Sequence, residues 1–300
     1  MNRTVRLAAA LGLALGACAA SAATPIDAKR AASANARVEI NNVRGRVDVR
    51  GWARNEVAVT GTLGEGAKFS LTGSDAHVVV RVETEDGNFS WWGGNGPRED
   101  TILTVNVPAA AALDVDTVSA DVDVEGISGA KELEVESVSG DVRVRGDAER
   151  VELTSVSGDL DVESNTRALS VETVSGDVDA KRVSGRIDAE SVSGTIRLEA
   201  ERVDDLNAAT VSGDVELRTG ALGSGRIKVE SMSGEVDIAI PANASARIEA
   251  ESFSGSITSD FGKVEEEEHG PGSSLSAVAG KGEAQITLES FSGDVTLRRN

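Results

Sequence analysis

A ten-residue phrase recurs along the chain, and it limits the fold more than any other feature. One copy runs from Glu136 to Arg145 and reads Glu-Ser-Val-Ser-Gly-Asp-Val-Arg-Val-Arg. Its central glycine returns at Gly140, Gly158, Gly176, Gly194, Gly213, Gly234, Gly255 and Gly293. The first four are 18 residues apart, and the next three follow at spacings of 19, 21 and 21. Repeats of about 20 residues are typical of stacked identical units, so the sequence predicts an extended β array.

The apolar pattern within one copy places a turn at the Ser-Gly step. Leu133 and Val135 occupy odd positions, whereas Val138, Val142 and Val144 occupy even ones. Successive side chains of a strand point to opposite faces, so a change of parity at a fixed place means that the chain changes direction there. We therefore interpret the eight glycines as structural repeat corners.

Two all-β architectures accommodate such a turn. In a long β-hairpin meander, Ser139-Gly140 would be a two-residue turn, and Glu136 would face Arg143 across antiparallel strands. In a parallel β-helix, or β-solenoid, each rung of about 18–21 residues bends at the corner and stacks on the next. We favour the solenoid, because the meander would need about 18 strands and open twisted sheets rarely exceed about 10.

The residue before Ser-Gly supports the same choice. A hairpin would leave this residue in solvent, whereas a solenoid corner can bury it, and no copy has a polar residue there. We therefore expect these side chains to be buried. The positions are Val138, Val156, Val174, Val192, Val211, Met232, Phe253 and Phe291.

The N-terminal segment has the features of a secretory signal peptide over residues 1–22. Arg3 and Arg6 precede an apolar run that ends at Ala17, and Ala20-Ser21-Ala22 is a small-residue cleavage site. The apolar run is too short to span a bilayer, and no later stretch is longer. These features predict an exported protein of the periplasm or cell envelope, without a transmembrane span.

The same segment allows a second interpretation. Leu15-Gly16-Ala17-Cys18 resembles a bacterial lipobox, which would acylate Cys18 and produce an outer-membrane lipoprotein. Plain cleavage after Ala22 is the interpretation we prefer. Because Cys18 is the only cysteine, the cleaved chain would contain no disulfide.

After the signal we expect two regions. Residues 23–110 form an N-terminal β region that starts and caps the solenoid, and residues 111–300 form the repetitive solenoid. An acidic segment at 262–274, which includes the run Glu265 to Glu268, is expected to be an inserted exposed loop.

Composition excludes one class of partner. The chain has a formal net charge of −20, which repels nucleic-acid phosphates and anionic lipid. We therefore expect no nucleic-acid binding. Aromatic residues make up 3% of the chain, so the core should be thin and aliphatic.

The sequence offers no catalytic constellation and no cofactor motif. The two histidines, His77 and His269, lie far apart in the sequence, and serine occurs at nearly every corner, as expected of a structural residue. We therefore predict that the protein is not an enzyme, with no catalytic or cofactor-binding residues.

An acidic column follows the corner glycines. Hard oxygen ligands in a row suit Ca²⁺, but the glycine-rich nonapeptide of calcium-binding β-rolls is absent, and Arg186, Thr195 and Ser256 interrupt the column. We prefer carboxylates that cap the corner amides. The column contains Asp141, Asp159, Asp177, Asp214 and Asp294, with Glu235 as a variant.

A glycine-rich loop carries the remaining candidate site. Phe89, Trp91 and Trp92 lie between Gly87 and Pro97. Exposed aromatic side chains can form a binding loop, and the alternative is that they fold back and cap the open end of the solenoid.

Several phrases resemble a known family. They are the Val-Ser-Gly-Asp-Val phrase, the Gly51-to-Val57 segment, the Ile240-to-Ser245 segment and the ending from Gly280 to Asp294. Over about residues 34–300 the chain resembles the bacterial "putative adhesin" family of β-strand-repeat proteins of unknown function. The resemblance implies an exported, right-handed β-helix-like fold, and it supplies no catalytic residues.

These observations favour a non-enzymatic cell-envelope protein, an adhesin or scaffold that presents a solenoid surface to an envelope protein or polysaccharide. Two alternatives remain open. One is a carbohydrate-active β-helix protein, which would need long loops that converge on a carboxylate cleft. The other is an envelope-stress or regulatory accessory protein.

Overall fold

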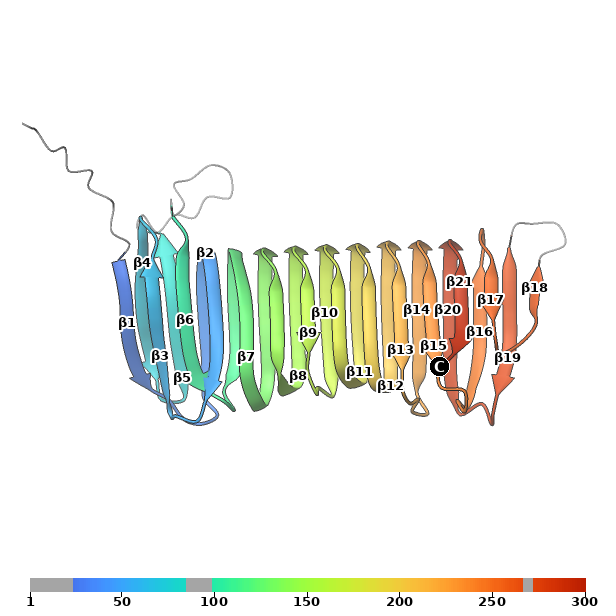
Figure 1. Cartoon of the computed structure of the whole chain (residues 1–300), viewed down its shortest axis with the longest axis horizontal. Helices are drawn as coiled ribbons and strands as arrows, with labels where there is room; N and C mark the ends of the chain where they lie inside the picture. The colour runs from blue at the N-terminus through green and yellow to red at the C-terminus, as the bar shows by residue number, and fades with distance from the viewer. Residues whose placement is uncertain (1–23, 85–98, 267–271) are drawn as a thin grey trace, which may run out of the picture.

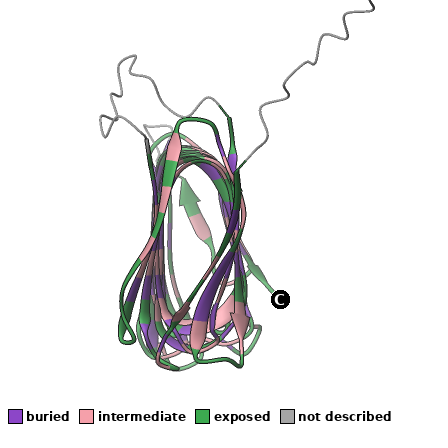
Figure 2. Ribbon diagram, turned by 90° about the vertical axis from the view of Figure 1, so that its left-hand side faces the viewer, coloured by how far each residue is buried: buried purple, intermediate pink, exposed green. Residues whose placement is uncertain are grey.

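The computed structural model describes residues 24–84, 99–266 and 272–300, and every regular element in these ranges is a β-strand. The strands wind into a rod with two long walls, joined at two corners in each turn (Figures 1 and 2). Strands of neighbouring rungs pair in parallel at one-rung offsets, as when Val171 lies between Leu153 and Ala189. The fold is therefore a parallel β-solenoid, and the hairpin meander is excluded.

Wall A holds the strands that lead into the Ser-Gly corner. In spatial order it begins with β4 (Ala67–Ser74), β5 (His77–Thr84), the first half of β2 (Arg37–Trp52) and parts of β7 (Ala112–Ser139). The second half of β8 (Val142–Ser157), β10 (Ala168–Ser175), the second half of β11 (Val178–Ser193) and the second half of β12 (Ile196–Ser212) follow. The wall ends with β14 (Arg226–Ser233), β20 (Ala284–Ser292), β16 (Ala246–Ser252), β19 (Ser273–Ala279) and β18 (Val264–Glu266).

Wall B holds the strands that follow that corner. In spatial order it contains β1 (Thr24–Ala31), β3 (Glu56–Leu63), β6 (Thr101–Pro108), the second half of β2, the middle of β7, the first half of β8, β9 (Leu160–Glu163), the first halves of β11 and β12, β13 (Val215–Thr219), β15 (Val236–Ile240), β21 (Val295–Arg299) and β17 (Ile257–Ser259).

Each rung buries a short alternating set of side chains. In one rung Leu169, Val171 and Thr173 point inward from wall A, and Val178 and Ala180 point inward from wall B. Alternation with period two is the rule for a strand with one buried face. The buried hydrophobic residues of the described ranges are all aliphatic, which agrees with the low aromatic content.

The residue before Ser-Gly is not buried, so that part of the sequence interpretation is wrong. Val156 and Val174 are each 46% exposed, and Val138 is half-buried. The buried series of wall A continues instead to the hydroxyl residue one position earlier, as at Ser137 and Ser155. The turn therefore occupies four residues, from Val138 to the residue after Gly140, and Val138 lies on its outer side.

The eight corner glycines stack in one column. The N–H of Gly158 donates to the carbonyl oxygen of Ser175 in the next rung (3.1 Å). Gly176 has φ of +147°, and a Cβ on it would lie less than 3.0 Å from the carbonyl oxygen of Gly158, closer than real Cβ atoms come. Glycine is required because the backbones of adjacent rungs meet here in a conformation that disfavours a side chain.

The last rung does not lie at the end of the rod. β20 pairs in parallel with both β14 and β16, and β21 pairs with both β15 and β17. The C-terminal rung is therefore inserted between two earlier ones (Figure 1). The spacing of the motifs suggested stacking in chain order, but Gly293 lies between Gly234 and Gly255.

Antiparallel strands bound the parallel stack at both ends. At the N-terminal end β4 pairs with β5, and β1 and β6 pair with β3. At the C-terminal end β19 pairs with β16 and with β18. The segment 262–274, expected to be a loop, thus contains β18 and the start of β19. Terminal units of repeat proteins need such covering, because an open edge can pair with other chains.

Candidate binding groove

An apolar ladder follows the outer side of the Ser-Gly corner. Nine large hydrophobic side chains are exposed in the described ranges, and seven of them belong to this ladder. Scattered surface hydrophobics are ordinary, but a contiguous apolar patch marks an interaction site. In spatial order the ladder contains Val156, Val174, Val192, Val211, Met232, Phe291 and Phe253.

The side chains of the ladder become larger toward the C-terminal end of the rod. Four valines, 46–47% exposed, are followed by Met232 at 59% and by Phe291 and Phe253 at 59% and 63%. The two phenylalanine rings stack with centroids 5.1 Å apart and planes at 8°. Six steps of about 4.8 Å between neighbouring strands give the ladder a length of about 29 Å.

An acidic row runs beside the ladder on the outer surface of wall A. Its eight positions carry six glutamates, one threonine and one alanine, with no basic residue. Within the described ranges only Glu230 has an ion-pair partner, Lys228, at 2.7 Å between Nζ and Oε2. In spatial order the row is Glu136, Thr154, Glu172, Glu190, Ala209, Glu230, Glu289 and Glu251.

The ladder and the acidic row from Thr154 onward together line one groove of about 1020 Å³. It runs from Val156 to Phe253 along wall A, and Ser273 and Ser274 of β19 also line it. The groove is linear, apolar on one side and acidic on the other.

Near the N-terminal end of the acidic row, neighbouring carboxylates on wall A repel one another. Burial raises the pKa of Asp116, and repulsion from Asp114 and Glu136 raises it further. Burial also raises the pKa of Glu134, again with repulsion from Asp114. Raised carboxyl pKa values show that this part of wall A disfavours further negative charge.

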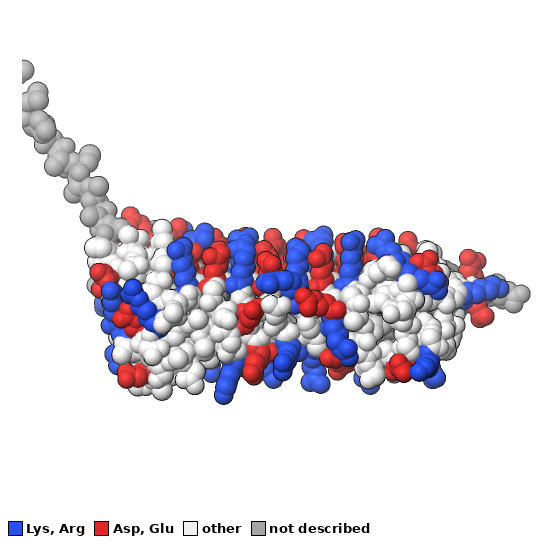
Figure 3. All heavy atoms as spheres, turned by 60° about the horizontal axis from the view of Figure 1, so that its bottom comes forward, with Lys and Arg blue, Asp and Glu red and all other residues white. Residues whose placement is uncertain are grey.

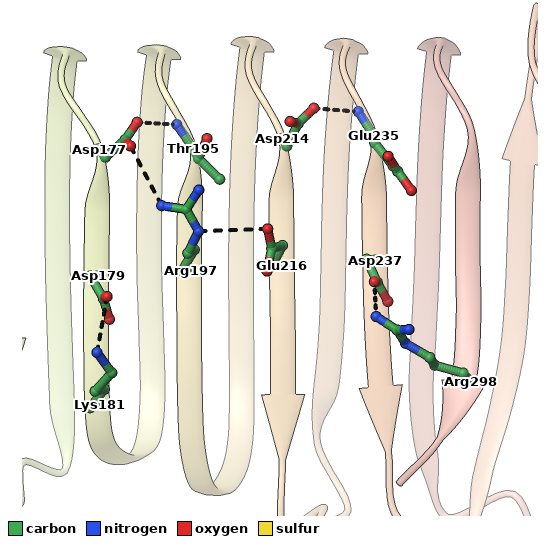
Figure 4. A network of polar contacts seen from close by, with 10 residues as sticks. All are labelled: Asp177, Asp179, Lys181, Thr195, Arg197, Asp214, Glu216, Glu235, Asp237 and Arg298. Carbon is green, nitrogen blue, oxygen red and sulfur yellow. Dashed lines mark hydrogen bonds and ion pairs between the residues drawn. The ribbon is translucent and has the colours of Figure 1, made fainter.

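The acidic column behind the corner has a structural role. Oδ1 of Asp141 accepts the backbone N–H of Asp159 (3.1 Å), and Asp159 accepts that of Asp177 in the same way (2.9 Å). The same hydrogen bond is present at Thr195, whose N–H donates to Asp177 (2.9 Å; Figure 4), so the acidic column continues past this residue. Arg186 lies at the opposite corner and does not interrupt the column.

The inserted rung obeys the same rule. Asp294 accepts the N–H and the hydroxyl of Ser256 at 2.8 and 2.9 Å. These hydrogen bonds from Ser256 lower the pKa of Asp294, the backbone bond first. The resulting stability is present above the ordinary pKa of aspartate and is lost as the pH falls through the lower folded-state value.

In the described ranges no group of three or more His, Cys, Asp or Glu side chains could hold a metal ion.

Wall B differs from the acidic row, because many of its outer charges form ion pairs. Arg197 lies 3.5 Å from Asp177 and 3.6 Å from Glu216, bridging three rungs (Figure 4). Arg145 bonds Glu125 at 2.9 Å. Basic and acidic side chains alternate along the rod in Figure 3. Unpaired acidity beside exposed apolar side chains is therefore a feature of the groove.

The other predicted site residues divide into two groups. Phe89, Trp91, Trp92, Cys18 and His269 lie outside the described residues. His77 lies on β5, and its Nε2 is 3.5 Å from Oε2 of Glu39. No helix in the described ranges is long and apolar enough to cross a membrane.

Comparison with known families identifies the chain. A family model described as Toastrack DUF4097 matches residues 35–223 and 219–298. The chain belongs to the Toastrack DUF4097 family. The resemblance noted in the sequence to an uncharacterised, adhesin-like bacterial family is thereby confirmed. The fold of this Toastrack chain is the repetitive β-solenoid described above.

No curated protein matches the chain. Among solved structures, a "putative lipid binding protein" from Parabacteroides distasonis ATCC 8503 is 13% identical, with a TM-score of 0.52 over 92% of this chain and 97% of that one. A "putative adhesin" from Parabacteroides merdae ATCC 43184 is 11% identical, with a TM-score of 0.43 over 92% and 96%. A "putative cell adhesion protein" from Clostridium sporogenes ATCC 15579 is 12% identical, with a TM-score of 0.22 over 92% and 100%. At 13% identity, the Parabacteroides distasonis structure supports the fold alone.

Proposed function

We propose that this Toastrack protein is a non-enzymatic binding protein of the cell envelope, adhesin-like in its role, and that the groove on wall A is its binding surface. The observation that carries this proposal is the apolar ladder, in which seven side chains between 46% and 63% exposed align on successive rungs. When a partner covers a continuous series of exposed apolar side chains, their removal from water makes the free energy of binding more favourable.

Three further observations support the proposal. The signal predicted for residues 1–22 would export the chain. The solved structures of similar fold include proteins described as adhesins and as lipid binding. Many acidic residues outside the groove have structural roles, since the column from Asp141 caps backbone amides and charges of wall B form ion pairs.

The proposal predicts that binding depends on the large end of the ladder. The triple variant Met232→Ser, Phe253→Ser, Phe291→Ser should bind envelope preparations of the producing bacterium at least about tenfold more weakly than the unmodified chain, because exposed aromatic anchors dominate binding energy. Labelled protein of residues 23–300 can be titrated onto the envelopes and quantified by sedimentation.

A matched control separates the ladder from general surface hydrophobicity. Ile102 and Val278 are 47% and 63% exposed but lie outside the ladder. The variant Ile102→Ser, Val278→Ser should keep the affinity of the unmodified chain. Equal affinity of the triple variant and this control would show that the ladder is not the binding surface.

A further inference from the structure

We propose that the groove binds a basic amphipathic helix of about 20 residues, lying along the rod with its apolar side on the ladder. This inference rests on the proposed function, since it names the class of partner that the same surface takes. It is argued from the charge of the two borders, the length of the ladder and the spacing of its steps.

The charge of the borders requires a basic partner. The acidic row has six glutamates and no basic residue, and within the described ranges Lys228 is the sole cation paired with it. On the other side of the ladder lie the corner serines and then the carboxylates that begin at Asp141. Lysine or arginine flanking the apolar face of a partner would meet carboxylates on both sides.

The same charge disfavours two other occupants. A second copy of this chain would place its own glutamate row against Glu172 and Glu190, and each chain has a formal net charge of −20. An anionic lipid surface would meet the same repulsion. Neither occupant could neutralise the acidic row.

The geometry of the ladder favours a helix over an extended strand. A helix rises about 1.5 Å per residue, so the ladder length of about 29 Å corresponds to about 20 residues. Apolar residues at i, i+3, i+4 and i+7 recur once per turn of about 5.4 Å, close to the rung spacing of about 4.8 Å. Same-face residues of a strand recur at about 6.6 Å and fall out of step with the rungs.

The end of the ladder with the phenylalanines should contribute most of the affinity. Phe253 and Phe291 present stacked rings, whereas the valine end offers small side chains. Helix-in-groove complexes depend on a few apolar anchors, while charges at the rim set orientation and specificity.

Three designed peptides of 21 residues test the inference against the chain of residues 23–300. The first carries leucine at i, i+3, i+4 and i+7 and lysine on both flanks. The second replaces every leucine with serine, and the third replaces every lysine with glutamate. Fluorescence anisotropy at about 0.15 M salt, where the Debye length is about 8 Å, limits non-specific attraction. The Leu/Lys peptide should bind at least about tenfold more tightly than the Ser/Lys peptide, and the Leu/Glu peptide should not bind.

Two variants of equal charge localise the site. Glu172→Gln, Glu190→Gln, Glu289→Gln should weaken binding of the Leu/Lys peptide about tenfold, through the loss of three pairs in one register. Glu149→Gln, Glu199→Gln, Glu201→Gln removes three exposed glutamates elsewhere and should change the affinity less than about twofold. Circular dichroism of the bound Leu/Lys peptide should show a helix.

Four results would overturn the inference. They are equal affinity for the Leu/Lys and Ser/Lys peptides, equal effects of the two glutamine variants, ladder-dependent binding to phosphatidylcholine vesicles in place of peptide, and ladder-dependent dimerisation in place of peptide binding. If the serine variant of the ladder loses envelope binding while the Leu/Lys peptide does not bind, the proposed function stands and the helix inference fails. If envelope binding does not depend on the ladder, the proposed function fails first.

Discussion

Replacing Gly176 with alanine is expected to lower the free energy of unfolding by about 3 kcal/mol or more. Two causes add. The backbone has φ of +147°, which a side chain disfavours, and the new Cβ would meet the carbonyl oxygen of Gly158 in the neighbouring rung. The carbonyl oxygens on either side of Gly158, those of Ser157 and Asp159, accept inter-rung hydrogen bonds from the N–H groups of Gly140 and Val142, so the rung of Gly158 cannot move away without losing them. Urea denaturation followed by circular dichroism measures the change.

Gly129 provides the matched control. It lies at the opposite corner with φ of +77°, and a Cβ there would have no heavy atom within 4 Å. Gly129→Ala should therefore cost only the conformational term, about 1–2 kcal/mol. If the two alanine variants were equally stable, the close approach of backbones at the Ser-Gly corner would not be a determinant of the fold.

The second large effect concerns the inserted rung. Leu288 is fully buried on β20, and its register partners are Val229 on β14 and Ala250 on β16. Leu288→Asp would place an unpaired carboxylate between the two rungs, at a local cost of about 4 kcal/mol or more. Hydrogen exchange should become fast in β16 and β19, which lie beyond the inserted rung although they precede it in the sequence.

Thr287→Asp is the control for this effect. Thr287 is the neighbouring residue on the same strand, and it points outward and is half-exposed. A carboxylate there stays in water and should leave exchange in β16 and β19 slow. Continued protection of β16 and β19 in Leu288→Asp would mean that they do not depend on the last rung.

The repeat was sufficient to predict the class of fold. The regular return of Val-Ser-Gly fixes a corner in each rung, because only glycine tolerates the approach seen at Gly176. The size of the array then disfavours a meander, and the parallel pairing of the strands excludes it. The parity of Leu133, Val135 and Val142 correctly located the turn, since inward positions of both walls obey it.

The orientation of Val138 and its equivalents could not be decided from parity alone. A four-residue turn and a shorter one produce the same switch, and the hydrophobic character of these residues favoured burial. The structure buries Ser137 and its equivalents instead. The groove was missed for this reason. An available signal was the column of Glu136, Glu172 and Glu190, which lacks any basic residue.

The position of the last rung was also beyond the sequence. The copies Glu230-to-Gly234, Glu251-to-Gly255 and Glu289-to-Gly293 have nearly identical sequences. Any two of them could therefore pair equally well, and the sequence does not indicate the order of their rungs in the stack. The stacked pair Phe253 and Phe291 belongs to adjacent rungs. The only two copies with phenylalanine before Ser-Gly are therefore neighbours, a hint that repeat spacing does not convey.

Disulfide trapping tests the order of the rungs most directly. The chain of residues 23–300 has no cysteine, because Cys18 is the only one in the sequence. Glu289 is in register with both Glu230 and Glu251. Neighbouring strands are about 4.8 Å apart, within the Cα separation of up to about 7 Å that a disulfide accepts, whereas strands two rungs apart are about 10 Å apart.

Three double variants should therefore behave differently under mild oxidation. Glu230→Cys with Glu289→Cys, and Glu251→Cys with Glu289→Cys, should each form an intramolecular disulfide that mass spectrometry detects, and Glu230→Cys with Glu251→Cys should not. Efficient trapping of the third pair, with no trapping of the other two, would contradict the interleaved solenoid.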